Sequence, residues 1–161
     1  MQTGQVIENF RLVLENPPNN SNSIARRTRC NVYILSDILL TPELCERHRG
    51  KVFVFADNSE RWGKAGQAII RDCPNSFGIR TKVSPRVYVT DQMFEKYCSW
   101  VKDDLETLLQ MNHFRDVVLH ASGYGNGLAD MPKRAPKCYE YLNLALNKFC
   151  GGNYFDIHAT S

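Results

Sequence analysis

The sequence predicts an α/β fold of three layers, in which helices cover both faces of a mixed, largely parallel central sheet. From Cys30 onward, short apolar runs of strand length alternate with segments of helical periodicity. One of these runs, KVFVF at 51–55, is β-branched and aromatic, as a central strand covered on both faces would be. Because strands that alternate with helices pair in parallel through right-handed crossovers, the pattern favours one sheet with helices on both sides.

The first 29 residues differ from this pattern. Residues 1–29 are expected to form an N-terminal extension or edge hairpin ahead of a single domain at 30–161. Within them, residues 5–15 fit a strand or a short helix equally, because their apolar residues follow neither period cleanly. The run NPPNNSNS at 16–23 is expected to be a loop, since its two prolines block regular hydrogen bonding and its Asn and Ser residues favour turns.

The domain is predicted to open with a strand at 30–35 and a helix within the segment 40–50. Thr41 is placed to cap this helix, Pro42 suits its first position and Gly50 follows its end. The same reasoning predicts the later elements. They are a strand at 51–55, a short helix at 66–73, a strand at 86–90, a long helix at 91–111, a strand at 116–121, a helix at 135–151 and a candidate last strand at 153–158.

The charge of the chain is mildly basic. Its formal net charge is +3, and the basic residues are spread out apart from a cluster at 25–29. Nucleic-acid binding usually needs a denser basic face. A basic nucleic-acid-binding module, which would rest on Arg26, Arg27, Arg29 and the run at 132–137, is therefore the less favoured alternative.

The spacing of the cysteines and the distribution of the apolar residues disfavour a metal site, a disulfide-bonded protein and a membrane protein. No two cysteines form a Cys-x-x-Cys pair, so we expect reduced thiols and no metal site. No window approaches the run of about 20 apolar residues that crosses a bilayer. The first residues lack the features of a secretory signal, so we expect a cytoplasmic protein without a membrane partner.

Three of the predicted strands are followed by unusual loops. The loops are LSDILL, which contains Asp37, then ADNSERWGKAGQA, which contains Asn58, and ASGYGNGLADMP. If the three strands are parallel neighbours, their loops share one edge of the sheet, where ligands of open α/β sheets bind. We therefore expect one pocket lined by Asp37, Asn58 and the backbones of 63–67 and 123–128.

Such a pocket suits a phosphate group. Gly123, Gly125 and Gly127 occupy alternate positions directly after a strand. Glycine allows a close approach and positive φ, and successive N–H groups form an anion-binding concavity. The G-x-G-x-x-G and P-loop patterns are absent, so a nicotinamide dehydrogenase or a P-loop ATPase is disfavoured and no cofactor is expected. A glycine-rich connection without a ligand is the alternative.

The same three segments resemble the macrodomain family, which binds ADP-ribose and related nucleotides. VYILSDILLTPEL resembles the first strand and turn of the family, which implies that Asp37 accepts a hydrogen bond from the adenine amino group. KVFVFADNSERWGKAGQAII resembles the strand and glycine-rich loop, which implies that Asn58 and 63–67 lie near the distal ribose. VVLHASGYGNGLADMPKRAP is similar to the loop whose amides hold the diphosphate, here 122–128. The resemblance implies a macrodomain-like nucleotide-binding domain.

The resemblance also implies a function and a set of site residues. The expected ligand is an ADP-ribose-type nucleotide or an ADP-ribosylated macromolecule, and an ADP-ribosyl hydrolase would use Asn58 or Asp57 to position ligand and water. The first loop has fewer glycines than the family pattern, which favours binding over catalysis. The alternatives are non-enzymatic sequestration of a nucleotide signal, as in a viral counter-defence protein, and an interaction protein with a vestigial pocket. The ligand-binding residues implied are Asp37, Ile38, Asn58, Gly63, Lys64, Ala65, Gly66, Gln67, Ser122, Gly123, Tyr124, Gly125, Asn126, Gly127 and Leu128.

Several side chains near these loops have a structural role as the alternative to ligand contact. Asp37 and Asn58 are both common turn residues, so the alternative for each is to stabilise a turn. Trp62 is either a lid over the site or, slightly favoured, a hydrophobic anchor. Tyr124, between loop glycines, is the favoured aromatic contact to a base or ribose. His120 is expected to be structural, and Ser122 has no partnered base that would make it a nucleophile.

Overall fold

The computed structural model describes residues 6–7, 9–15, 29–152 and 154. Its sheet has the strand order β1-β2-β3-β7-β4-β5-β6. The middle strands β3, β7, β4 and β5 are parallel, whereas the pairs β1–β2, β2–β3 and β5–β6 are antiparallel. The predicted mixed, largely parallel sheet is therefore confirmed. The strands are β1 (Val6–Ile7), β2 (Phe10–Leu14), β3 (Val32–Leu35), β4 (Lys51–Asn58), β5 (Ser76–Ser84), β6 (Val87–Tyr88) and β7 (Asp116–His120).

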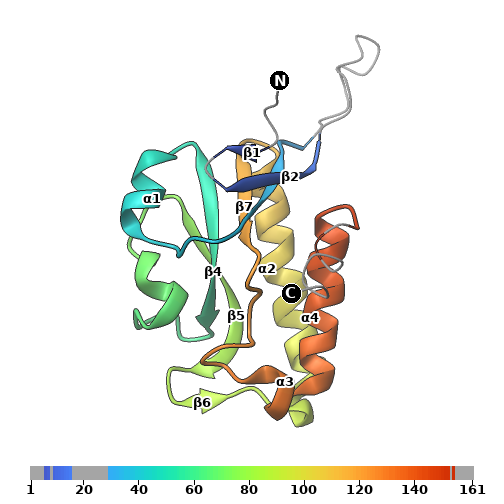
Figure 1. The fold of residues 1–161 in the computed structure, drawn as a ribbon. Coiled ribbons are helices and arrows are strands. Elements are labelled where there is room, and N and C mark those ends of the chain that lie inside the picture. The colour runs from blue at the N-terminus through green and yellow to red at the C-terminus, as the bar shows by residue number, and fades with distance from the viewer. Residues whose placement is uncertain (1–5, 8, 16–28, 153, 155–161) are drawn as a thin grey trace.

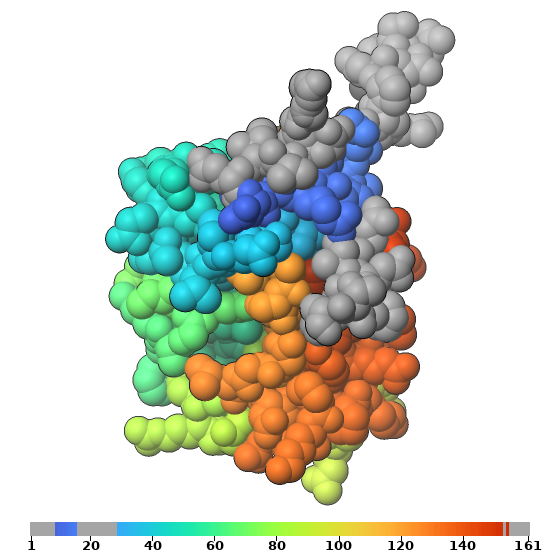
Figure 2. All heavy atoms as spheres, viewed as in Figure 1, coloured from blue at the N-terminus to red at the C-terminus, as the bar shows by residue number. Residues whose placement is uncertain are grey.

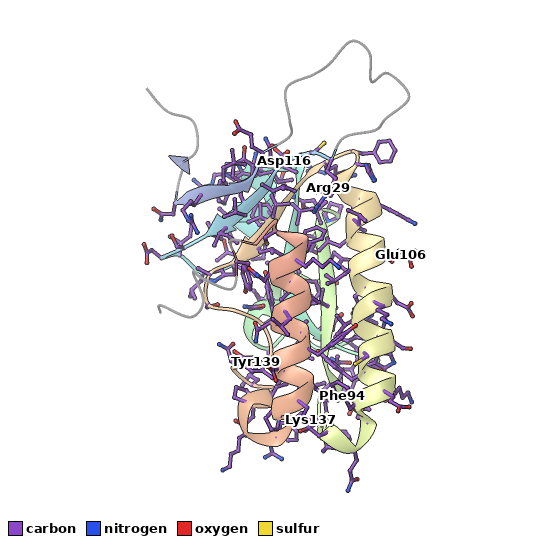
Figure 3. The ribbon with its side chains drawn as sticks, turned by 90° about the vertical axis from the view of Figure 1, so that its right-hand side faces the viewer. Arg29, Phe94, Glu106, Asp116, Lys137 and Tyr139 are labelled. Atoms are coloured by element: carbon purple, nitrogen blue, oxygen red, sulfur yellow. The ribbon has the colours of Figure 1, made fainter. Side chains whose placement is uncertain are left out.

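Helices cover both faces of this sheet, which confirms the three-layer α/β/α fold (Figure 1). On one face α2 and α4 run side by side (Figure 3), and their Tyr97, Leu108 and Leu146 join one apolar core. On the other face α1 and η2 place Leu44 and Ile70 in a second core. The helices are α1 (Pro42–Arg47), η2 (Gly66–Ile70), η3 (Asp91–Met93), α2 (Phe94–Asn112), α3 (Met131–Arg134) and α4 (Pro136–Phe149), where η marks a 3-10 helix.

The start of α1 follows the sequence prediction. The Thr41 Oγ1 accepts a hydrogen bond from the Leu44 N–H at 3.1 Å, and Pro42 occupies the first helical turn. The helix ends at Arg47, earlier than residue 49, the last position before the predicted stop at Gly50. The predicted helix at 66–73 is a 3-10 helix, and it is shorter than predicted, since it ends at Ile70.

The strand β5 was not predicted from the sequence, and the predicted strand at 86–90 is only the two-residue edge strand β6. Gly78 and Arg80 obscure the strand pattern of β5, and tertiary contacts explain both residues. The Arg80 Nη2 lies 2.9 Å from the Asp104 Oδ1 on α2. A Cβ on Gly78 would lie 2.6 Å from the Cβ of Asp57 on the neighbouring strand. Glycine at 78 therefore makes room for a buried carboxylate.

The N-terminal segment resolves into strands. Residues 6–7 and 10–14 form an antiparallel hairpin, and β2 pairs with β3, so the helix alternative for 5–15 is wrong. The predicted loop at 16–23 and, apart from Tyr154, the candidate strand at 153–158 lie outside the described residues.

All six cysteines are free thiols, and three of them are buried. Burial raises the pKa of both Cys45 and Cys138 to about 12. These two thiols are therefore protonated near neutral pH and poor nucleophiles. None of the helices in the described part of the chain combines the length and apolarity that a membrane span needs.

Candidate functional site

A cavity of about 590 Å³ opens at the carboxyl ends of β4 and β5. In Figure 2 it is the hollow between the green segment around η2 and the orange loop that follows β7. Its volume falls within the range of roughly 300–1,000 Å³ that is typical of small-molecule sites. Its lining residues are Ala56, Asp57, Asn58, Trp62, Gly63, Lys64, Ala65, Gly66, Gln67, Ala68, Arg71, Thr81, Lys82, Pro85, Tyr88, Ser122, Gly123, Gly125, Asn126, Gly127, Leu128 and Ala129.

Asp57, at the end of β4, is the one carboxylate among these lining residues, and it is fully engaged. Its side chain is 2% exposed and forms an ion pair through both oxygens with Arg71. The Arg61 Nη1 lies 3.1 Å from the Asp57 Oδ2, and the Asn58 N–H donates to Oδ1 at 2.7 Å. A carboxylate held in this way orders its surroundings and has little capacity left to act as a base.

The ion pairs of Asp57 continue into the interior. Arg61 also contacts Asp104 on α2, with its Nη2 3.0 Å from Oδ1. Asp104 is 4% exposed and accepts from the main-chain N–H and the guanidinium of Arg80 on β5. Two buried carboxylates and three arginines, with Arg71 the third, thus form one connected network. This network fastens the cavity loop that contains Arg61 to both β5 and α2.

Asn58 lines the cavity, but its side chain organises the turn that follows β4. Its Nδ2 donates to the Trp62 carbonyl oxygen at 2.8 Å, and its Oδ1 accepts from the Glu60 N–H at 2.9 Å. This is the turn chemistry that the sequence offered as the alternative to ligand contact. Asn58 therefore shapes the cavity wall through the 58–62 turn.

Gln67 joins the two glycine-containing loops. Its Oε1 accepts from the Ala56 N–H at 2.8 Å, and its Nε2 donates to the Gly123 carbonyl oxygen at 3.1 Å. The Ser122 Oγ lies 3.5 Å from the same nitrogen. One side chain from η2 thereby fixes the ends of β4 and β7 relative to each other.

Two runs of main-chain amides line the cavity without internal partners. Within the described residues, no N–H group of 63–67 or 125–129 makes a hydrogen bond. Gly63, Gly66 and Gly125 have positive φ values of 97°, 61° and 89°. Successive unpaired N–H groups in such loops are the arrangement that binds anions. The two runs approach closely, because a Cβ on Gly66 would lie 3.2 Å from the side chain of Leu128.

Lysine and arginine side chains add positive charge to the lining. Arg71 is paired with Asp57, and Lys64 forms an ion pair with Asp72. Lys82 makes no ion pair with any described residue: its Nζ donates to the Pro85 carbonyl oxygen at 2.6 Å and lies 4.6 Å from the centre of the Tyr88 ring. Lys82 therefore supplies a positive charge that no carboxylate neutralises in this part of the molecule.

The predicted contacts of Asp37, Ile38 and Tyr124 do not fit this cavity. Asp37 and Ile38 follow β3 and are not among the lining residues. Tyr124 is completely buried: its hydroxyl donates to the Val54 carbonyl oxygen at 3.0 Å and accepts from the His120 N–H at 2.7 Å. The expectation that the Tyr124 ring stacks on a ligand is wrong in this structure, because the ring belongs to the core.

His120 is structural, as its position predicted. Its Nδ1 accepts from the Ser122 N–H at 3.0 Å, and its Nε2 lies 2.6 Å from the Ile38 carbonyl oxygen, to which it donates. Both ring nitrogens are thus used to connect the loops after β3 and β7. Among the described residues, the hydroxyl of Ser122 makes no hydrogen bond to a His, Asp or Glu side chain.

Trp62 is half exposed and lines the cavity, so it is not the core anchor that the sequence slightly favoured. Its indole N–H donates to the Glu60 Oε1 at 2.9 Å, and no cation of the described residues is stacked on its ring. An exposed aromatic ring at the mouth of a cavity can stack on a base or cover a ribose.

Arg71 and Thr81 of the site were not predicted, and Lys82 was considered only as a possible source of positive charge for a diphosphate. Arg71 lies in an apolar helical segment, and Thr81 and Lys82 lie in the strand that was not predicted. No local pattern pairs Arg71 with Asp57, because they are 14 positions apart and meet only across the fold. The one available signal is the basic character of Lys82, which by sequence alone fits a diphosphate contact or, more commonly, solvated surface.

Comparison with known proteins places this site within a family. A model of a family of unknown function, DUF7831, matches residues 35–145, and this stretch contains every lining residue of the cavity. No curated protein and no solved structure matches the chain.

Proposed function

The chain belongs to the family of unknown function DUF7831, and for this member we propose binding of ADP-ribose or a related nucleotide diphosphate in the cavity at the ends of β4 and β5. The observation that carries the proposal is the pair of unpartnered amide runs, 63–67 and 125–129, which line one cavity from two sides. Two amide runs suit a ligand with two linked phosphates, because the N–H groups of each run can donate hydrogen bonds to one phosphate.

The charge of the lining supports an anionic ligand. Asp57 is neutralised by its arginines, whereas the ammonium group of Lys82 has no acidic partner among the described residues. A free cation beside unpaired N–H groups attracts phosphate and strengthens each hydrogen bond to it. The exposed ring of Trp62 offers an apolar surface for the base or a ribose.

The resemblance of three segments to macrodomains narrows the ligand to the ADP-ribose class. The three strands that carry these segments, β3, β7 and β4, are parallel neighbours. The adenine contact implied for Asp37 is not part of the proposal, because Asp37 lies outside the cavity lining. We assign the diphosphate to the two amide runs and the base to the Trp62 side of the cavity.

Binding without turnover is the favoured form of this function. Hydrolysis needs a group that activates water, and the lining contains no His, Cys or Glu. Its one carboxylate, that of Asp57, is held by two guanidinium groups. Removal of ADP-ribose from a modified macromolecule, with Asn58 or Asp57 positioning the water, is the second candidate.

We also propose that the protein works in the cytoplasm. Its six thiols are free, and free thiols are typical of a reducing compartment.

Isothermal titration tests the proposal directly. We expect ADP-ribose to bind more tightly than AMP, because AMP has a single phosphate and leaves one amide run unoccupied. NAD serves as a comparator that carries the diphosphate with a larger second group. Absence of heat with all three nucleotides would contradict the proposal, and release of free ADP-ribose from a modified protein would establish the hydrolase instead.

Lys82→Gln is expected to weaken ADP-ribose binding about tenfold or more, since a hydrogen bond to a charged group contributes roughly 1.5–3 kcal/mol. The matched control is Lys64→Gln, which changes another lining lysine whose charge is already paired with Asp72. We expect the control to lose less than about fivefold, because exposed ion pairs contribute roughly 0–1 kcal/mol. If the two variants lose equal affinity for ADP-ribose in the same titration, Lys82 does not contact the ligand.

A further inference from the structure

The surface beside the cavity is strongly basic. We call it the basic patch; it comprises Lys82, Arg86, Lys133, Arg134 and Lys137. The two segments that contain it, 82–91 and 130–137, hold five basic residues and two acidic ones. Their excess of three positive charges equals the net charge of +3 of the whole chain. This local excess of basic over acidic residues makes the two segments a candidate anion-binding surface.

Contacts between the two segments make the patch one surface. The guanidinium carbon of Arg134 lies 3.6 Å from the centre of the Tyr88 ring, and the Lys82 Nζ lies 4.6 Å from the same ring. The Asp91 carboxylate accepts from the Lys137 N–H at 3.1 Å. Lys82 and Tyr88 also line the cavity, so the patch continues directly from its wall.

The acidic residues of these segments leave most of the patch unneutralised. Asp91 is engaged by main-chain N–H groups at the start of α4, and Asp130 is paired with Arg134 at 3.1 Å. Arg86, Lys133 and Lys137 are exposed and make no ion pair within the described residues. Figure 3 shows Lys137 at the start of α4, where its Nζ lies 4.7 Å from the centre of the Phe94 ring.

We propose that the basic patch binds the phosphodiester backbone of a single-stranded nucleic acid whose terminal nucleotide occupies the cavity. This inference rests on the proposed nucleotide site and extends its ligand from a free nucleotide to a nucleotide at the end of a chain. A strand that leaves the cavity past Lys82 meets the exposed cations next, and phosphates bind such cations with release of counterions. A single strand fits better than a duplex, because only an unpaired terminal base can enter the cavity and reach the ring of Trp62.

The test is a pair of triple variants with the same change of charge. Arg86→Gln, Lys133→Gln and Lys137→Gln remove exposed cations of the patch that do not line the cavity. Arg49→Gln, Arg115→Gln and Lys148→Gln remove three exposed cations near α1, the end of α2 and the end of α4. The probe is a 5′-phosphorylated single-stranded oligodeoxynucleotide of about twelve residues, within the range of roughly 4–16 nucleotides that such sites cover.

Binding of this probe to the wild type is expected to weaken steeply with salt, with a slope of about −0.7 in log K against log salt for each phosphate contact. The patch variant should bind at least tenfold more weakly at low salt, and its slope should fall by up to about 2. The control variant should bind as the wild type does. Free ADP-ribose should compete with the probe for the wild type.

Titration with ADP-ribose separates this inference from the proposed function. Both triple variants should bind ADP-ribose like the wild type, because their changed residues lie outside the cavity lining. If ADP-ribose binds but the probe does not, or if both variants lose equal affinity for the probe, the nucleic-acid inference is wrong and the nucleotide site stands. A patch that binds polyglutamate but not the probe would also overturn it. If the probe binds through the patch and ADP-ribose does not bind, the proposed function is wrong, and the placement of the terminal nucleotide in the cavity is wrong with it.

Discussion

Asp57→Asn is expected to lower the free energy of unfolding by about 3 kcal/mol, the lower end of roughly 3–5 kcal/mol for breaking a buried ion pair. The substitution keeps the size of the side chain but removes the charge that neutralises Arg71, whose side chain is 15% exposed. The lower end applies because Arg61, the second partner, is 39% exposed and retains part of its hydration. The same substitution should weaken ADP-ribose binding, since the loop of 58–66 loses its internal support.

Thermal and denaturant unfolding measure this effect. For a chain of this length, about 3 kcal/mol corresponds to a fall in Tm of roughly 6–12 °C. The matched control is Asp103→Asn, which removes an exposed carboxylate next to the buried Asp104 and should change stability by less than about 0.5 kcal/mol. If Asp57→Asn is as stable as this control, the ion network does not hold the cavity loop.

Gly125→Val is expected to abolish ADP-ribose binding. Gly125 has a φ of 89°, a conformation that a β-branched residue strongly resists, and its N–H belongs to the second amide run. From the sequence alone, this substitution in a glycine-rich loop after a strand is expected to leave the fold largely intact. The structure corrects that expectation, because a Cβ at this position would lie 2.6 Å from the Sδ of the buried Met131 and 3.5 Å from the Cγ2 of Thr81. We therefore expect an additional loss of about 1–3 kcal/mol in stability from overpacking.

A second variant separates lost binding from lost folding. Gly127 belongs to the same amide run, its φ is not positive, and a Cβ there would meet no atom within 4 Å. Gly127→Ala should therefore fold normally and retain affinity within about threefold, since an alanine keeps the N–H group. A folded Gly125→Val protein, verified by circular dichroism, that binds ADP-ribose normally would show that the second run does not hold phosphate.

Elements with strong local signals could be predicted from the sequence. The alternation of apolar strands with helices predicted the three layers. Thr41 and Pro42 predicted the start of α1. The sequence left open whether the strands β3, β7 and β4 are neighbours, and the structure places them side by side. The strand β5 could not be predicted from local pattern. Its Arg80 pairs with Asp104 on α2, and its Gly78 makes room for Asp57 on β4, so both residues are explained by other elements.

The site was predictable in outline only. The two glycine-containing loops do line one cavity, because β4 and β7 are adjacent. Asp37 lies beyond it, because β7 separates β3 from β4 and moves the loop after β3 one strand further from the cavity. Tyr124 is flanked by loop glycines, yet the chain turns inward there and its hydroxyl satisfies the carbonyl of Val54. Periodicity reveals neither the place of the loop after β3, which depends on strand order, nor the burial of Tyr124.

The central claim is that two runs of unpaired amides hold a diphosphate. The most direct test is a series of ¹H–¹⁵N spectra of the labelled protein during titration with ADP-ribose. The account predicts that the largest shifts occur at the amides of 63–67 and 125–129, while those of the α1 helix stay in place. Binding that moves other amides and leaves both runs unchanged would contradict it.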